Sequence, residues 1–206
     1  MILETLCLGP MEVNCYILAP APDSRAIIID PGFEKEKIER VLKKYNLQAE
    51  FIINTHGHFD HIGCDGEFGI PVYIHRQDAA LLKDPKRNLS AFFMSSFSLK
   101  SEIRILEDKQ KLELGQMQLE VIHTPGHTPG GIALLMKKPE EKILFTGDTL
   151  FCGGIGRTDF PGADENLLIR SIKEKLLKLS DDTVIYPGHG ASSTIGEEKK
   201  NNPFLN

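Results

Sequence analysis

A dense cluster of possible metal ligands follows an apolar run near the first quarter of the chain. The run, Phe51-Ile52-Ile53, is typical of a buried strand, and the ligands are His56, His58, Asp60 and His61. Imidazole and carboxylate groups suit zinc, iron and manganese. One metal ion cannot readily bind all four groups of so short a loop. The cluster therefore indicates two metal ions, each binding a pair, and its density disfavours a merely histidine-rich surface loop.

Length and charge favour a single globular domain. With 206 residues the chain can bury one sizeable core, so we expect one domain over residues 1–206. The net charge of −5 and the lack of a basic run give no indication of nucleic acid or membrane partners. No apolar stretch approaches the ~20 residues of a membrane span. Residues 1–5 lack the features of a secretory signal, so we expect a cytoplasmic location.

Ligand-type side chains recur after three further strand-like runs. Residues 119–122 lead to His127, residues 143–145 lead to Asp148, and residues 184–186 lead to His189. If these strands and strand 51–53 share a direction, their carboxyl ends bring the ligands to one edge of a sheet. Other segments complete the prediction: strands at 2–8, 12–19, 26–29, 71–74, 103–106, 111–114 and 117–122, helices at 34–45 and 164–179, and a short helix with an exposed end over 197–206.

Residues 84–100 have no regular pattern but contain four large apolar side chains, Phe92, Phe93, Met94 and Phe97. They are expected to pack into the main core. A flap over the site or a surface for a partner are the alternatives, and the sequence does not decide between these two.

Counting ligands indicates that one side chain bridges two ions. Two metal ions need more ligands than seven side chains supply, unless one group is shared. A carboxylate has two oxygens and can bridge, whereas an imidazole cannot. Asp148 is the candidate bridge, because Asp60 is committed by its position beside His61. The complete set is His56, His58, Asp60, His61, His127, Asp148 and His189.

Four motifs in this chain resemble those of the metallo-β-lactamase superfamily in their order and spacing. They are Thr55-His56-Gly57-His58-Phe59-Asp60-His61, His123-Thr124-Pro125-Gly126-His127-Thr128, Thr146-Gly147-Asp148-Thr149 and Pro187-Gly188-His189-Gly190. Within the superfamily the chain is similar to short bacterial relatives of the type II glyoxalases, the hydroxyacylglutathione hydrolases. The resemblance implies an α/β fold, a four-layer αβ/βα sandwich with the metal site at one edge of the two sheets.

The same resemblance implies a ligand set and a reaction. His56, His58 and His127 would hold one metal ion, Asp60, His61 and His189 the second, and Asp148 would bridge them. The implied activity is a dinuclear metal-dependent hydrolase that cleaves thioesters of the S-2-hydroxyacylglutathione type by attack of a metal-bound hydroxide. Asp60 and Asp148 are the expected catalytic residues. The expected cofactors are two divalent ions, with zinc favoured and iron or manganese as alternatives. The partner is a small-molecule substrate, and the oligomeric state stays open.

Three residues outside the ligand set have candidate roles. The loop 151–162 contains glycines that allow close backbone approach to a ligand, and Arg157 in it is the candidate substrate contact. Type II glyoxalases have a basic residue in a similar loop that contacts glutathione. Asp30 and His123 are expected to support the ligands through hydrogen bonds, with a turn-forming or structural role as the alternative. His75, without a companion ligand, is expected at the surface.

Two departures from the type II glyoxalases weaken the glutathione assignment. The longer enzymes have a C-terminal helical domain, which we do not expect here, and a tyrosine where this chain has Ala191. The main alternative is a persulfide dioxygenase, because those enzymes also show a stretch like residues 156–160. It would use a single iron held by His56 or His58 with His127 and Asp148. A lactonase, β-lactamase or phosphodiesterase of the same fold is less favoured, and a binding module without chemistry least of all.

Overall fold

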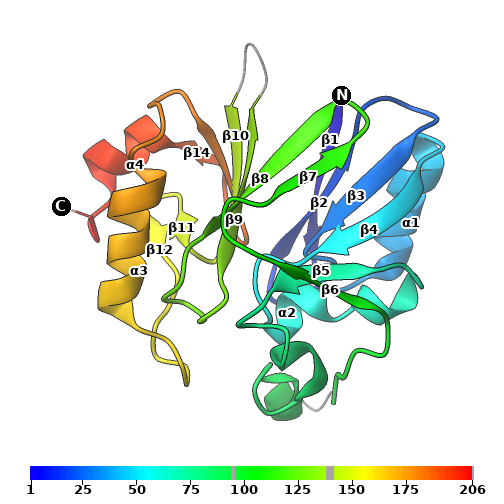
Figure 1. The fold of residues 1–206 in the computed structure, drawn as a ribbon, viewed down its shortest axis with the longest axis horizontal. Coiled ribbons are helices and arrows are strands. Elements are labelled where there is room, and N and C mark those ends of the chain that lie inside the picture. Colours follow the sequence, from blue (N-terminus) through cyan, green and yellow to red (C-terminus); the bar gives the residue numbers. More distant parts are fainter. Residues whose placement is uncertain (94–95, 138–141, 206) are drawn as a thin grey trace.

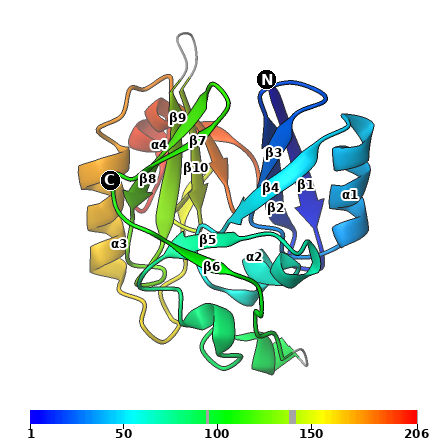
Figure 2. The same ribbon diagram turned by 45° about the vertical axis from the view of Figure 1, so that its right-hand side comes forward.

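Two six-stranded β-sheets lie at the centre of the molecule, with helices on their outer sides (Figure 1). This computed structural model describes residues 1–93, 96–137 and 142–205. Helix α1 covers one sheet, and α3 and α4 cover the other, as the turned view also shows (Figure 2). The expected four-layer αβ/βα sandwich is confirmed.

The first sheet has its six strands in chain order. Neighbours β1 to β3 are antiparallel, whereas β3 to β6 run parallel. Helix α1 provides the crossover from β3 to β4, and its buried Ile38 and Val41 pack on Ile28 and Ile52 of the sheet. The elements are β1 (Ile2–Leu8), β2 (Val13–Ala19), β3 (Arg25–Ile29), α1 (Lys35–Lys44), β4 (Gln48–Ile53), β5 (Val72–His75) and β6 (Ile103–Leu106).

The second sheet has the order β14-β13-β10-β9-β8-β7. Strands β10 and β13 are parallel, and the other neighbours are antiparallel. Its strands and helices are β7 (Lys111–Leu114), β8 (Met117–His123), β9 (Ile132–Lys137), β10 (Lys142–Gly147), α3 (Glu165–Ser171), β13 (Val184–Pro187), β14 (Ser193–Thr194) and α4 (Ile195–Asn201).

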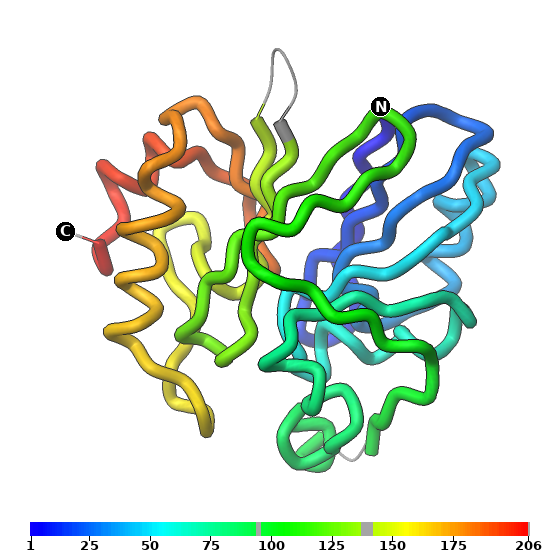
Figure 3. The backbone as a smooth tube through the Cα atoms, viewed as in Figure 1, coloured from blue at the N-terminus to red at the C-terminus, as the bar shows by residue number. Residues whose placement is uncertain are grey.

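Short elements fill the connections between the large ones. A two-stranded ribbon follows β10, and three single turns of 3₁₀ helix lie between β4 and β6. In the backbone trace, residues 76–93 gather beside α2 at one end of the molecule (Figure 3). These elements are α2 (Phe59–Ile62), β11 (Leu150–Phe151) and β12 (Gly154–Ile155), with the 3₁₀ turns at Asp65–Glu67, Leu81–Lys83 and Ser90–Phe93.

The layered arrangement explains why several strands are apolar on both faces. Every residue of β2 is buried, because one face packs against the second sheet and the other against the helical layer. Between the sheets the ring of Tyr16 lies 5.0 Å from that of Phe145 and 5.7 Å from that of Tyr186. Strands buried on two sides lose the simple alternation of apolar and polar residues.

Two predicted helical boundaries differ from the structure. The segment 164–179 is α-helical only to Ser171 and then forms a π-helical turn, Ile172–Leu176, closed by the amide of Leu177 donating to the carbonyl of Ile172. The expected exposed C-terminal end is also partly wrong, because Leu205 is buried among the side chains of α3 and the second sheet. Asn206 and Met94 lie outside the described residues. Among the described helices none could cross a membrane.

The N-terminus of α3 provides a test of this arrangement. The carboxylate of Asp164 accepts a hydrogen bond of 2.9 Å from the amide of Leu167, so Asp164 is the N-cap of α3. Asp164→Ala should lower the free energy of unfolding by about 1 kcal/mol in urea titrations followed by circular dichroism. Asp164→Asn should stay close to wild type, because asparagine caps a helix about equally well. Equal losses in both variants would contradict the capping role.

Candidate metal centre

The seven side chains predicted as ligands come together at one edge of the two sheets. They lie at the carboxyl ends of β4, β10 and β13 and in the connection between β8 and β9. Strands β8, β10 and β13 share a direction, so their ends meet at the same edge. His56 and His58 precede α2, Asp60 and His61 lie within it, and His127, Asp148 and His189 follow β8, β10 and β13 respectively.

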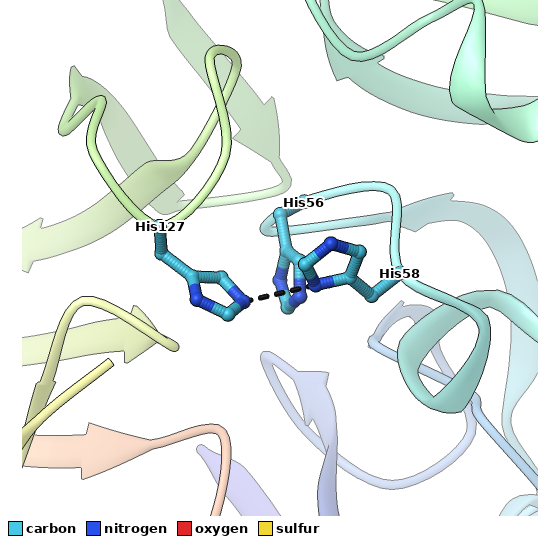
Figure 4. Close-up of side chains that lie close together, drawn as sticks. All are labelled: His56, His58 and His127. Atoms are coloured by element: carbon cyan, nitrogen blue, oxygen red, sulfur yellow. Dashed lines mark hydrogen bonds between the residues drawn. The ribbon is translucent and has the colours of Figure 1, made fainter. Parts of the chain in front are cut away.

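Three imidazoles converge to form one group of potential ligands, as Figure 4 shows. The Nδ1 atom of His58 lies 2.9 Å from the Nε2 atom of His127. The ring of His56 is 4.8 Å from each of the other two rings, centroid to centroid. Its buried Nε2 atom has no hydrogen-bond partner in the described structure. The ring nitrogens of His58 and His127 face each other, and that of His56 has no partner, so the three imidazoles can direct lone pairs at one metal ion.

Asp60, His61 and His189 form a second group beside the first. The Nε2 atom of His189 lies 3.3 Å from Oδ2 of Asp60 and 3.3 Å from Nε2 of His61. Asp148 lies between the groups. Its Oδ1 is 3.4 Å from Nε2 of His61, and its Oδ2 is 3.6 Å from Nε2 of His127. Its Oδ2 is also 3.7 Å from Nε2 of His189, so the carboxylate of Asp148 approaches ligands of both groups, as a bridging position requires.

These spacings fit metal ions. Two nitrogen ligands of a tetrahedral zinc ion, each ~2.1 Å from the metal, lie about 3.4 Å apart. Most of the separations above fall near that value. The buried Oδ1 of Asp148, like Nε2 of His56, has no hydrogen-bond partner among the described residues. Buried polar atoms without partners are costly unless something binds them. The histidine and aspartate cluster can thus bind metal, and its donor set suits zinc, iron or manganese.

The far nitrogen of several of these imidazoles is held by an oxygen acceptor. Nδ1 of His61 donates to Oδ2 of Asp30 at 3.0 Å, Nδ1 of His127 to the carbonyl of Arg157 at 2.7 Å, and Nδ1 of His189 to the carbonyl of Met11 at 3.0 Å. With the proton on Nδ1, the lone pair of Nε2 points into the cluster. Such acceptors fix the tautomer and ring orientation of metal-binding histidines.

Asp30 is the acceptor that joins two loops. It is 1% exposed and adopts a left-handed backbone conformation with φ 52°. Its carboxylate accepts hydrogen bonds from the amide and the hydroxyl of Thr55, at 2.8 and 2.7 Å, in addition to that from His61. This is the kind of supporting contact that the sequence predicted for Asp30.

A second buried carboxylate, Asp78, was missed by the sequence analysis. It is fully buried, and it accepts hydrogen bonds from the amides of Gly57 and Gly130 and from the hydroxyl of Thr128, at 3.0, 2.7 and 2.7 Å. It therefore joins the loop of His56 and His58 to the loop of His127. Nothing in the sequence around Asp78 indicates that its side chain points inward.

His123 and His75 lie away from the ligand cluster. Their rings stack, 4.0 Å apart and 14° from parallel, and Nε2 of His123 donates to the carbonyl of Pro129 at 2.9 Å. His123 thus stabilises the loop that carries His127. None of the described hydrogen bonds joins His123 to the imidazole of His127. The expectation of a surface position for His75 is wrong, since its residue is 5% exposed. Burial lowers the pKa of His75 to about 4.

Electrostatics prepare the cluster to bind cations at neutral pH. Burial lowers the pKa of His58 to about 3 and holds the pKa of His56 well below its usual value, so both rings are neutral. Although burial opposes ionisation, the neighbouring His61 keeps the pKa of Asp148 below its usual range. Conversely, Asp148, Asp60 and Asp30 outweigh burial and raise the pKa of His61. Metal ligands bind in their deprotonated forms, so a cation replaces the proton that these carboxylates favour on His61.

A cavity of about 360 Å³ opens onto the cluster. Arg157 borders it, but its guanidinium pairs with both carboxylate oxygens of Asp159, at 2.7 and 2.6 Å, and lies over the ring of Phe160. The guanidinium of Arg157, the candidate substrate contact, is therefore already paired with a carboxylate of the same chain. The apolar part of the lining consists of Met11, Phe59, Leu89, Phe93, Phe151, Ile155 and Phe160.

The segment 84–100 combines two of its predicted roles. Phe97 packs against the outer core of the first sheet, whereas Leu89 and Phe93 line the cavity. Phe92 is 74% exposed. The ring of Phe93 stacks on that of Phe59, the residue between His58 and Asp60. The segment is thus part of the cavity wall rather than only core.

The fold and the cluster of histidines and aspartates define a metallo-hydrolase. The chain belongs to the metallo-beta-lactamase superfamily, whose family model matches residues 8–189. The hydroxyacylglutathione hydrolase GloC of Haemophilus influenzae is 37% identical over 212 residues, covering 100% of this chain and 99% of that protein. The crystal structure of the BLEG-1 B3 metallo-beta-lactamase matches this chain with a TM-score of 0.91. The two sequences are 38% identical, and the match covers 99% of each chain. The crystal structure of TTHA1623 in a di-iron-bound form is 36% identical, covers 98% of this chain and all of that one, and has a TM-score of 0.84.

Removing the Asp78 carboxylate tests the connection between the two metal loops. Asp78→Ala leaves three buried donors without an acceptor and should lower the free energy of unfolding by at least about 3 kcal/mol. Zinc affinity should fall by about 10- to 100-fold, because the loops lose their shared anchor. Denaturant titration and competition with a zinc chelator measure the two effects. The exposed neighbour provides the control, since Gln77→Ala should change neither.

Proposed function

We propose that this protein is a dinuclear metal-dependent hydrolase that cleaves thioesters of the S-2-hydroxyacylglutathione type. The observation that carries the proposal is the position of Asp148, whose carboxylate lies 3.4 Å from His61, 3.6 Å from His127 and 3.7 Å from His189, between the two groups of potential ligands. His56, His58 and His127 would hold one ion, and Asp60, His61 and His189 the other. The similarity to GloC along the full length of both chains supports the substrate class.

The reaction adds water across the bond between the acyl carbon and the sulfur. The water oxygen joins the acyl carbon, the carbon–sulfur bond breaks, and the products are a carboxylic acid and a thiol. When bound, divalent ions would supply a water of pKa roughly 7 and would polarise the carbonyl. The residues of the chain position the reactants: Asp60 borders the cavity and would accept a hydrogen bond from the attacking water, Asp148 borders it as the shared ligand, and the apolar wall excludes bulk solvent. A thiolate leaves readily, so no separate general acid is needed.

A mononuclear iron dioxygenase is less well supported by this geometry. Such an enzyme requires only two histidines and one carboxylate. Here Asp60, His61 and His189 form a complete second group, and Asp30 and Met11 hold two of its imidazoles in place. A site for one ion does not need that second group. The arrangement therefore favours two ions, which zinc, iron or manganese all fit.

Hydrolysis of β-lactams is a second candidate, because the chain is 38% identical to the BLEG-1 B3 metallo-beta-lactamase. The same cluster would serve either reaction, since both are attacks of water on a carbonyl. The leaving groups differ: an amide nitrogen needs a proton on departure, whereas a thiolate does not. Thioester cleavage is preferred because a thiolate leaves without a proton, and because the similarity to GloC extends along the full length of both chains.

Parallel assays on separately reconstituted zinc and iron forms test the proposal. S-Lactoylglutathione, a chromogenic cephalosporin and glutathione persulfide are the substrates, followed by thioester absorbance, β-lactam absorbance and oxygen uptake. The thioester should be cleaved with the highest kcat/KM, and only when two ions are bound per chain. Oxygen consumption by a form with one iron, without thioester cleavage, would replace the proposal with the dioxygenase.

Asp148→Ala tests the shared ligand directly. The variant should retain at most one ion per chain by elemental analysis. Its kcat should fall by at least about 10³-fold, since several kcal/mol of transition-state stabilisation depend on the paired ions. Asp159→Ala, which removes an exposed carboxylate that is paired with Arg157 and lies outside the ligand cluster, should keep both ions. Full metal content and activity in Asp148→Ala would show that this residue is not the bridge.

A further inference from the structure

A second cavity of about 280 Å³ adjoins the one above the metal cluster. The two cavities share three lining residues, His58, Leu89 and Phe160. Because these side chains border both spaces, the two cavities are direct neighbours. The second cavity is therefore within reach of the far end of a molecule whose reacting group lies at the cluster.

Two cations at the rim set the second cavity apart chemically. Lys86 and Arg87 line it, and both are exposed. Within the described ranges neither side chain has a hydrogen-bond or ion-pair partner. Asp84 accepts hydrogen bonds from their backbone amides, at 3.0 and 3.3 Å, and so fixes the turn that presents them. Among the described residues, no carboxylate lines this cavity; its other walls are Leu81, Thr128, Pro129, Pro161 and Gly162.

Arg157 cannot supply the same binding group without losing an existing interaction. Its guanidinium is bound at two points by Asp159 and stacks over Phe160. An incoming carboxylate would have to displace Asp159 from a fork geometry that is already satisfied. Lys86 and Arg87 have no such competitor, so an anion gains their full interaction.

We propose that this second cavity binds the anionic end of the thiol half of the substrate, with Lys86 and Arg87 paired to its charged groups. This inference rests on the proposed thioester hydrolysis. A tripeptide thiol extends over about 10 Å, whereas the atoms within each ligand group lie within 4.8 Å of one another. Its charged end therefore lies beyond the cluster. Carboxylates of a peptide thiol and phosphates of a nucleotide thiol share the required chemistry, and experiment distinguishes them.

Binding of uncleavable thioethers tests the site independently of turnover. Isothermal titration calorimetry on the zinc-loaded protein compares S-hexylglutathione, its diethyl ester and S-hexyl-coenzyme A. The double variant Lys86→Gln/Arg87→Gln should raise the Kd of the matching anionic ligand by about tenfold, in line with two partly exposed ion pairs. The effect should shrink with added salt. The ester of a peptide thiol, which lacks the carboxylates, should bind both proteins equally.

Lys83→Gln is the matched control, because Lys83 is an exposed cation of the same segment that lines neither cavity. It should leave each Kd unchanged. An identical Kd in wild type and double variant would overturn the inference, as would failure of both anionic thioethers to bind wild type. Weakening for S-hexylglutathione alone assigns carboxylates, and weakening for S-hexyl-coenzyme A alone assigns phosphates.

Hydrolysis by the same proteins separates this inference from the proposed function. With a thioester that the wild type cleaves, the double variant should raise KM by about tenfold and change kcat by less than about twofold, because the cations contact only the tail. Cleavage with an unaltered KM would overturn the anion site and leave the hydrolase intact. No cleavage of any thioester, with weakened thioether binding in the double variant, would overturn the hydrolase and support the anion site.

Discussion

Two buried carboxylates hold the metal loops together, and the rest of the site depends on them. Asp30 binds Thr55 and His61, and Asp78 binds Gly57, Thr128 and Gly130. Each of these carboxylates is costly to bury, and each is compensated by several hydrogen bonds. Because they join segments that are far apart in sequence, the loops cannot shift independently. Ligands on otherwise irregular backbone are thereby fixed relative to one another.

The sandwich supplies the rigidity that these loops lack. Apolar packing on both faces of each sheet holds β4 of the first sheet and β10 and β13 of the second in place, and the ligands follow their carboxyl ends. Close packing continues into the loops themselves. A Cβ atom at Gly188 would lie 2.2 Å from Oδ1 of Asp148, so only glycine allows the His189 loop to pass so near the bridging candidate. The glycine of the motif Pro187-Gly188-His189 thus allows a close approach to Asp148, and its histidine is a potential ligand.

The sequence predicted most of the strands and the position of the ligand cluster, because both follow from local patterns. Apolar runs identify strands, and ligands placed directly after them come together whenever the strands share a direction. What could not be predicted depends on contacts distant in sequence. The inward orientation of Asp78, the stacking of His75 on His123, and the pairing of Arg157 with Asp159 leave no periodic signal. The π-helical turn after Ser171 likewise depends on packing rather than on the apolar spacing.

The pairing of Arg157 with Asp159 bears on how a substrate could be recognised. A basic residue next to the metal cluster is typical of a direct substrate contact. In this protein the guanidinium of Arg157 is paired with Asp159, and its backbone carbonyl accepts a hydrogen bond from His127. Ala191 offers no hydroxyl where related enzymes have a tyrosine. If the substrate is the proposed thioester of an anionic thiol, its recognition needs cations elsewhere, and Lys86 and Arg87 line the adjoining cavity without partners of their own in the described structure. The chain as a whole carries a net charge of −5, so any attraction of an anionic ligand comes from these two cations and not from the net charge of the protein.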